Sequence, residues 1–209
     1  VQLSGGITRR GRFAPVPAAP ATFAFAFGSC HEPFTEVPGG GRVEKHPGAA
    51  IYPPLRAMLA ERRTRFALWL GDQVYSDSIA GLDIRKQLVE EGTVTDQELL
   101  DAYRHLYRGF FGESGFRALA EELPAYLMWD DHDIVDGWGS VPPAGELDRR
   151  LYRAAEGAFG EYQALRNPAG ALGAAGPFDF SFWYGDVGFH VADLRSERDW
   201  EAERVMGDE

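Results

Sequence analysis

The sequence of 209 residues contains a single cysteine, Cys30, so it cannot form an internal disulfide bond. It has no run of 18 or more apolar residues, and we therefore expect no membrane-spanning helix. Positive charge is scarce, because 21 lysines and arginines stand against 32 aspartates and glutamates. The net charge of -11 repels polyanions, so we expect neither a nucleic acid nor an anionic membrane as a partner. A small phosphorylated substrate is compatible with this charge, since bound cations reverse the field inside a pocket.

The length and composition are those of a folded domain. A hydrophobic content of 44% over 209 residues allows one domain with a sizeable core. Residues 1–21 are rich in glycine, arginine, proline and alanine, so we expect a lead-in segment there and one domain over residues 22–209. The pair Arg9-Arg10 resembles part of a twin-arginine export signal. Prolines and an expected strand follow it in place of a hydrophobic region, so we assign no intact signal peptide.

Three short apolar segments each end in chemically reactive side chains. In chain order they are residues 22–27 followed by Cys30, residues 66–70 followed by Asp72 and Tyr75, and residues 126–129 followed by Asp130, Asp131, His132 and Asp133. Each segment has the length of a buried strand. In open α/β sheets, ligands bind beyond the carboxyl ends of the strands. We therefore expect the three ends to converge and their side chains to form a metal site.

The residue types indicate which metal such a site would hold. Thiolate and phenolate groups bind a trivalent or thiophilic ion well, so Cys30 together with Tyr75 favours iron over magnesium. Each feature also has a purely structural interpretation. The pair Gly71-Asp72 is typical of a turn, and a lone cysteine such as Cys30 is often a small buried hydrophobe.

The acidic segment 130–133 is harder to explain without a cation. Its three carboxylates raise one another's pKa unless a cation or hydrogen-bond donors neutralise them. We therefore favour a metal-linked role over a solvated acidic loop. Within it, His132 is a candidate to protonate a leaving oxygen, to bind phosphate or to ligate a metal. Arg195 is a second catalytic candidate, because Arg195 and Arg198 can face one anion, with exposed ion pairs as the alternative.

The remaining pattern predicts how the chain joins these segments. Residues 23–27 are apolar on both faces, so we expect a central strand. A helix that begins at Pro53-Pro54 should connect it to the 66–70 strand, and such a unit normally places two parallel strands side by side. Residues 31–50 should form a loop, with His31 at its surface.

Further along, the spacing predicts helices and then a hairpin. Thr95 and Glu98 have the form of a capping box before an amphipathic helix, in which Tyr103, Tyr107 and Phe110 are expected to be core residues and His105 to be exposed. Short and long helices should follow over residues 116–122 and around residues 151–162. Alternation over residues 178–191, interrupted by Gly185-Asp186, predicts an antiparallel hairpin.

Four blocks along the chain resemble, in the same order, those of the alkaline phosphatase D (PhoD-like) family of metallophosphoesterases. They are Gly28-Ser29-Cys30, Gly71-Asp72-Gln73-Val74-Tyr75, Trp129-Asp130-Asp131-His132-Asp133 and Asp193-Leu194-Arg195-Ser196-Glu197-Arg198. The segment from Tyr103 to Arg108 also resembles a tyrosine- and arginine-rich helix of that family. The resemblance covers residues 22–209. Each block alone is weak evidence for the family, but four blocks in the same order are specific to it.

This resemblance implies a fold, an activity and a set of site residues. The implied fold is of the α/β (α+β) class, a calcineurin-like metallophosphoesterase with two packed sheets flanked by helices. The implied activity is hydrolysis of phosphate monoesters or diesters by metal-activated water, with Fe³⁺ and Ca²⁺ as cofactors and other divalent metals as substitutes. By position, the implied ligands are Cys30, Asp72 and Tyr75 for iron and Asp72 and Asp131 for calcium, with His132 at the phosphate or the leaving group.

Two features depart from the family pattern. Asp133 stands where glutamate is more usual, which should matter little because that position need not ligate a metal. The family also has a later block whose glycine, aspartate and histidine complete the metal site, and residues 1–209 contain no such block. We therefore expect the front portion of a catalytic domain with an incomplete second sheet, inactive as this piece alone. A shortened relative with an impaired site is the alternative.

The leading hypothesis is thus a bacterial-type phosphatase or phosphodiesterase that acts on a small phosphate ester. The alternative from another class is a non-catalytic metal- or anion-binding domain derived from the same fold. A third hypothesis is an α/β domain whose aspartates only cap helices and which binds no metal tightly. The resemblance also implies an extracellular or periplasmic location, whereas the oligomeric state follows from none of these motifs.

Overall fold

The computed structural model describes residues 15–19, 21–36, 43–77, 84, 94–140, 142, 145–168 and 176–198. Most of the expected lead-in segment and the polar end of the chain after residue 198 lie outside the described residues. The strands are β1 (Ala24–Gly28), β2 (Phe34–Glu36), β3 (Val43–Lys45), β4 (Thr64–Leu70), β5 (Ala125–Met128), β6 (Phe180–Tyr184) and β7 (Val187–Val191). The helices are η1 (Pro47–Ile51), α1 (Tyr52–Glu61), α3 (Asp96–Gly112), α4 (Ser114–Glu122), α5 (Glu146–Tyr162) and η2 (Ala164–Arg166). The described residues therefore form the mixed α/β structure that the sequence predicted.

Strands β1, β4 and β5 form a parallel sheet in the order β1-β4-β5. The parallel pairing of β1 with β4, joined through α1, confirms the predicted strand-helix-strand unit. The prediction that residues 23–27 form a central strand is wrong, because β1 lies at the edge among the described strands. No residue of β1 is fully buried, and Phe25 is 40% exposed, so its apolar residues are only partly covered. At its end, the side chain of Phe27 is 73% exposed.

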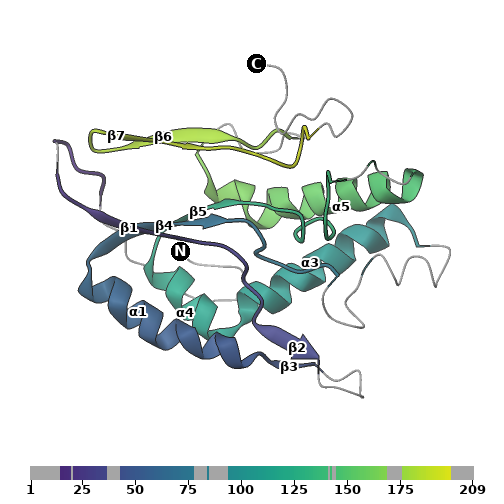
Figure 1. Ribbon diagram of the computed structural model, residues 1–209, viewed down its shortest axis with the longest axis horizontal. Helices are drawn as coiled ribbons and strands as arrows, with labels where there is room; N and C mark the ends of the chain where they lie inside the picture. The colour runs from purple at the N-terminus through teal and green to yellow at the C-terminus, as the bar shows by residue number, and fades with distance from the viewer. Residues whose placement is uncertain are drawn as a thin grey trace, which may run out of the picture.

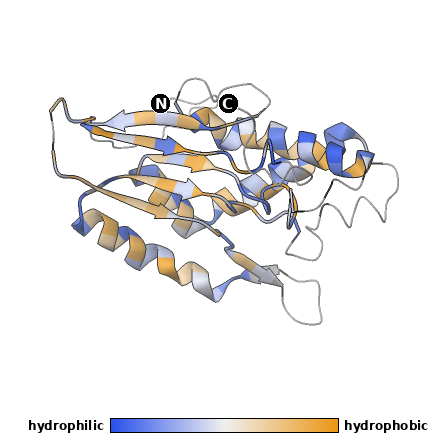
Figure 2. Ribbon diagram, turned by 45° about the horizontal axis from the view of Figure 1, so that its top comes forward, coloured by the Kyte–Doolittle hydropathy of each residue, from blue (hydrophilic) through white to orange (hydrophobic). Residues whose placement is uncertain are grey.

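The sheet lies between the β6-β7 hairpin and a layer of helices (Figure 1). Alternate residues of β4 face the two layers. Phe66 points to the hairpin, where its ring centroid lies 5.4 Å from that of Phe189. On the other face, Ala67 packs with Leu59 of α1 and Leu119 of α4. Figure 2 shows hydrophobic residues concentrated on the strands between these layers.

The β6-β7 hairpin matches the predicted alternation. Tyr184 pairs with Val187 across the turn formed by Gly185 and Asp186. Gly185 has a φ of 62°, which a glycine adopts without the cost of a side chain. His190 is exposed on the face of β7 opposite the buried Val191.

Helices α3 and α5 pack against each other beside the sheet (Figure 1). At the start of α3, Thr95 Oγ1 accepts a hydrogen bond from the Glu98 amide at 3.2 Å, and Glu98 accepts one from the Thr95 amide at 2.8 Å. The predicted capping box is therefore confirmed. Tyr103, Tyr107 and Phe110 are buried, which confirms their interpretation as core residues. None of the helices in the described residues is both long and apolar enough to span a membrane.

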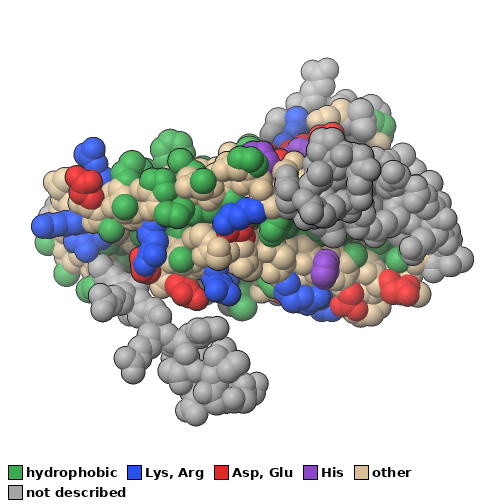
Figure 3. Space-filling model, turned by 90° about the horizontal axis from the view of Figure 1, so that it is seen from below, with side chains coloured by type: hydrophobic (Ala, Val, Ile, Leu, Met, Phe, Trp, Pro, Cys, Tyr) green, Lys and Arg blue, Asp and Glu red, His purple; other side chains and the backbone are tan. Residues whose placement is uncertain are grey.

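Residues 31–50 contain more structure than the expected loop. Within them β2 and β3 pair as a short antiparallel hairpin, followed by η1. Strands of three residues are too short for a period-two pattern to be recognised. Lys45 at the end of β3 pairs with Glu113 at the start of α4, which ties this hairpin to the helical layer. Seen from below, charged side chains of both signs are interspersed across the surface (Figure 3).

Candidate metal centre

The loops that follow β1 and β4 are joined directly to each other. The amide of Cys30 donates to the carbonyl of Gly71 at 3.1 Å, and the amide of His31 donates to the carbonyl of Asp72 at 2.7 Å. Cys30 and Asp72 both have left-handed backbone conformations, with φ of 61° and 54°. As a result the Cys30 thiol lies 3.4 Å from Oδ2 of Asp72. The structure thus brings together two candidate ligands that are 42 positions apart.

Gly71 allows the end of β4 to approach the end of β5. A Cβ atom on Gly71 would lie 2.3 Å from Cβ of Asp130, and the glycine has a φ of 99°. Both the space and the backbone conformation therefore require glycine at this position. The Gly71-Asp72 pair is a turn, as its structural interpretation holds, and this turn also places a carboxylate beside the acidic segment.

Asp72, Asp130 and Asp131 form an acidic cluster at these strand ends. One carboxylate oxygen from each lies within 4.8 Å of the others. Burial raises the pKa of Asp72, the Cys30 thiol opposes this by hydrogen bonding, and the nearby Asp130 carboxylate raises the pKa further. Oδ1 of Asp72 is buried and accepts no hydrogen bond from any described residue. A buried, unpartnered carboxylate oxygen among other carboxylates is the environment that a bound cation stabilises.

Tyr75 joins the same group of side chains. It is buried, and its hydroxyl is close enough to Cys30 and Asp72 for both to affect its pKa. Burial and the carboxylate of Asp72 raise its pKa, which keeps the phenol protonated without a cation. The ring of Tyr75 lies 4.4 Å from that of His132. Cys30, Asp72 and Tyr75, the residues that the family resemblance assigned to iron, are therefore neighbours.

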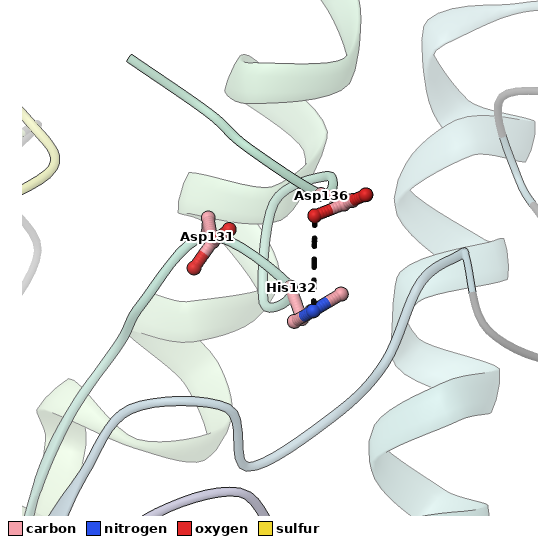
Figure 4. Close-up of side chains that lie close together, drawn as sticks. All are labelled: Asp131, His132 and Asp136. Carbon is pink, nitrogen blue, oxygen red and sulfur yellow. Dashed lines mark ion pairs between the residues drawn. The ribbon is translucent and has the colours of Figure 1, made fainter. Parts of the chain in front are cut away.

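His132 is held in one orientation by Asp77, a residue that the sequence analysis missed. Oδ1 of Asp77 lies 2.8 Å from Nδ1 of His132, and its other oxygen accepts from the amide of Asp136. Burial lowers the pKa of His132, but the hydrogen bond to Asp77 and the charges of Asp77, Asp72 and Asp131 together outweigh this, so the pKa is raised overall. The carboxylate of Asp136 faces the second ring nitrogen, Nε2, at 3.9 Å (Figure 4). The sequence feature that could have identified Asp77 is its position, because it follows Asp72 by five residues on the same loop.

Asp131, His132 and Asp136 are a second group whose potential ligand atoms lie within 4.8 Å of one another. Figure 4 shows that they project from one loop after β5. Asp131 belongs to both groups, and its Oδ2 accepts a hydrogen bond from the Gly137 amide at 2.7 Å. This loop therefore supplies oxygen and nitrogen donors to two adjoining positions.

Arg195 faces the acidic cluster. Its guanidinium pairs with Asp130 and with Asp131, the latter at 3.1 Å, and donates to the carbonyl of Trp138 at 2.8 Å. Burial lowers the pKa of Arg195, but the ion pair with Asp130 outweighs this and raises it overall. The expected partner Arg198 instead has its aliphatic chain against Gly139, where a Cβ would lie 2.6 Å from Cδ of Arg198. Arg195 thus offsets part of the negative charge of the cluster, through Asp130 and Asp131.

Asp133 acts within the protein interior. Its Oδ2 accepts from the amides of Gln73 at 3.3 Å and Asp130 at 2.9 Å, which links the loops after β4 and β5. Its Oδ1 accepts from Nε2 of Gln163 at 2.8 Å. Burial raises the pKa of Asp133 to about 7. The side chain therefore positions the two loops that carry the cluster, while its fully buried carboxylate faces protein donors.

His31 is buried rather than at the surface, and the expectation of a surface histidine is wrong. Its Nδ1 pairs with the hydroxyl of Tyr52, and its Nε2 lies 3.2 Å from the carbonyl of Phe110. Burial lowers its pKa to about 4, so the ring is neutral near pH 7. Its ring packs against Phe110 of α3 and Phe116 of α4, which lie much later in the chain, so the local sequence pattern did not reveal its burial.

The fold and the cluster together define an α/β protein with a candidate metal centre at the carboxyl ends of parallel strands. The model of the PhoD-like phosphatase family matches residues 26–208, and the chain belongs to this family. One solved structure, described as "Structure of PhoD", is similar with a TM-score of 0.58 and 20% sequence identity. The similarity covers 88% of this chain and 34% of that one, so the chain spans about a third of the length of that protein. A comparison with curated proteins found no match.

Proposed function

We propose that this chain contributes the metal centre of a hydrolase that cleaves phosphate monoesters or diesters. Family membership supports a metal-dependent phosphatase. The observation that carries the proposal concerns Asp72: no described residue satisfies its buried Oδ1, and its side chain lies among a thiol, a phenol and two further carboxylates. These potential ligand atoms lack enough hydrogen-bond donors within the protein, and such a set of ligands is suited to binding cations.

The residues present fit the metals that the family resemblance implies. Cys30, Asp72 and Tyr75 offer a thiolate, a carboxylate and a phenolate, which suit ferric iron. Asp72 and Asp131 offer hard oxygen ligands, which suit calcium. When bound, such a metal pair lowers the pKa of a water molecule and offsets the negative charge that accumulates on phosphorus.

The chain's own residues would bind the ester and handle a proton. Because Nδ1 of His132 is engaged by Asp77, the nitrogen available for the phosphate or the leaving oxygen is Nε2. In its protonated form, His132 would donate a proton to the leaving oxygen from that atom. Arg195 holds Asp130 and Asp131 in place and keeps the charge of the cluster from forcing the two carboxylates apart.

We extend the proposal to the finer architecture and to the location. The β6-β7 hairpin, which packs on one face of the β1-β4-β5 sheet, would be the first part of the second sheet of a calcineurin-like sandwich. The domain would comprise residues 22–209 as part of a longer catalytic domain. The family resemblance favours an extracellular or periplasmic location and a small phosphate ester as substrate, and the net charge of -11 disfavours nucleic acid.

One observation favours the alternative, a non-catalytic metal- or anion-binding domain. The guanidinium of Arg195 already contacts two carboxylates and the carbonyl of Trp138, which leaves it few free donors for a substrate. In that case the same fold would bind a cation without turnover.

Turnover by the full-length protein separates the two functions. The metal-loaded protein is assayed with p-nitrophenyl phosphate and bis-p-nitrophenyl phosphate, before and after removal of metal with a chelator. The proposal predicts turnover that stops on chelation, returns with Fe³⁺ and Ca²⁺, and falls at least about 10-fold in Asp131→Asn. Asp186→Asn, an exposed aspartate of the hairpin turn, is the matched control and should keep full activity. Tight metal binding without turnover of either ester supports the binding domain instead.

A further inference from the structure

A cavity of about 260 Å³ lies between the loop after β5 and the first half of α5. Its lining consists of Trp138, Arg149, Tyr152, Arg153 and Ser196. We call it the aromatic pocket. It contains no candidate metal ligand, so its chemistry differs from that of the acidic cluster: two rings and two guanidinium groups converge on one space.

The wall of the aromatic pocket is a fixed stack of rings. Trp138 and Tyr152 lie with centroids 5.2 Å apart and planes inclined by 20°. The ring of Tyr152 is also 5.6 Å from that of Trp129, which is buried in the core. Ser196, which also lines the pocket, donates its hydroxyl hydrogen bond to Oδ2 of Asp193. Because two other rings hold Tyr152 in place, the flat wall exists before any ligand arrives.

The charged residues that line the aromatic pocket are two arginines, Arg149 and Arg153. Both pair with Glu146, at 3.0 and 2.8 Å, and the carboxylate of Asp96 also acts on Arg153. Both arginine side chains are more than half exposed and can reorient toward a ligand. In a chain with a net charge of -11, these two guanidinium groups can attract an anionic group to this position.

The aromatic pocket adjoins the candidate metal centre. Arg195 donates to the carbonyl of Trp138 at 2.8 Å and to Oδ1 of Asp131 at 3.1 Å, so one guanidinium connects the wall to the cluster. The amide of Gly137, next to Trp138, donates to Oδ2 of Asp131 at 2.7 Å. A molecule whose phosphate lies at the carboxylates therefore has the pocket within reach of its organic part.

We propose that the aromatic pocket binds the organic part of the phosphate ester, and that its preferred occupant is a planar ring bearing a negative charge. This inference rests on the proposed function, because it assumes that the phosphate binds at the metal centre. A ring stacks on the indole of Trp138. A carboxylate on that ring pairs with Arg153 or Arg149. The volume is slightly below the range of about 300–1,000 Å³ for drug-sized ligands, so it suits a single ring system.

Binding of three non-hydrolysable phosphonates tests this specificity without requiring turnover. The probes are methylphosphonate, phenylphosphonate and 4-carboxyphenylphosphonate, titrated into the metal-loaded full-length protein by calorimetry. Affinity should rise in that order. Trp138→Leu should reduce the preference for phenyl over methyl by about 3- to 10-fold. Arg153→Gln should remove about 2- to 5-fold of the affinity for the carboxylated ring and leave phenylphosphonate unchanged.

Arg150→Gln is the matched control. It changes an arginine of the same helix that pairs with Asp96 and does not line the aromatic pocket. It should bind all three probes as the unsubstituted protein does. Equal affinity for the three probes overturns the inference while leaving the metal centre intact. Failure of methylphosphonate itself to bind points to the metal centre and overturns the proposed function together with this inference.

Discussion

Asp77 and His132 form a pair that spans two loops, with Oδ1 of Asp77 2.8 Å from Nδ1 of His132. The other oxygen of Asp77 accepts from the amide of Asp136, so one carboxylate fixes both the imidazole and the loop that carries it. This arrangement occupies Nδ1 and leaves Nε2 facing the carboxylate of Asp136 at 3.9 Å. The orientation of His132 is therefore set by a residue 55 positions earlier in the chain.

Replacing Asp77 with asparagine should misalign His132 while the fold persists. An asparagine has only one acceptor atom, so if it accepts from the Asp136 amide, its NH₂ group can only donate to His132, which removes the acceptor that Asp77 offers to a protonated Nδ1. We expect kcat for p-nitrophenyl phosphate to fall by about 10- to 100-fold with little change in KM. Steady-state kinetics on the metal-loaded protein checks this. An equal loss in Asp186→Asn, or a rise in KM alone, contradicts a role for Asp77 in orienting His132.

Replacing Gly71 with alanine should disrupt the junction of β4 and β5. The added Cβ would lie 2.3 Å from Cβ of Asp130, and the φ of 99° disfavours any side chain. We expect the free energy of unfolding to fall by at least about 1–3 kcal/mol, with loss of metal affinity because Asp130 moves. Urea denaturation and metal titration measure both effects.

Gly109→Ala is the control for that substitution. This glycine lies within α3, and nothing lies within 4 Å of the position of its added Cβ. Alanine there should increase the free energy of unfolding by up to about 1 kcal/mol through helix propensity. If both substitutions have the same effect, the close approach of Gly71 to Asp130 is not what restricts position 71 to glycine.

The Lys45–Glu113 ion pair should make stability fall in acid. Burial raises the pKa of Glu113, but the contacts with Lys45 and the Phe116 amide outweigh this, so the pKa lies below its usual value of 4.5. The folded state then binds fewer protons than the unfolded state as the pH falls through this range. The contribution is complete above pH 4.5 and disappears as the pH drops through the lowered pKa.

Glu113→Gln tests this contribution. The variant should lose about 1 kcal/mol of unfolding free energy at pH 7, because it weakens the cap on α4 and removes the charge opposite Lys45. The difference from the unsubstituted protein should shrink towards pH 3 in urea denaturation. A difference that is constant from pH 7 to pH 3 contradicts a depressed pKa in the folded state.

Local patterns predicted the elements well where one physical signal was strong. The capping box at Thr95 and the alternation around Gly185 each rest on a few adjacent residues, and both were confirmed. Predictions failed where the answer depended on distant packing. The edge position of β1 follows from which strands pair, and the burial of His31 follows from helices that lie much later in the chain.

The same distinction between local pattern and distant packing applies to the candidate site. Strand ends indicated that Cys30, Asp72 and Asp131 would lie near one another, because parallel strands bring their carboxyl ends to one edge. The hydrogen-bonding partners of those groups were not predictable. Asp77 has no motif of its own, and the internal role of Asp133 depends on Gln163, a residue of the segment after α5. Such contacts depend on side-chain geometry that spacing alone does not encode.

The metal content of Asp72→Asn tests the central claim most directly. Asparagine tolerates the left-handed φ of 54° at this position, so the fold should lose less than about 1 kcal/mol of unfolding free energy. After reconstitution with Fe³⁺ and Ca²⁺, elemental analysis and the visible absorption of a ferric thiolate or phenolate are measured on both proteins. We predict bound iron and the absorption band in the unsubstituted protein and loss of both in Asp72→Asn. Full metal content in the variant would contradict a metal centre built around Asp72.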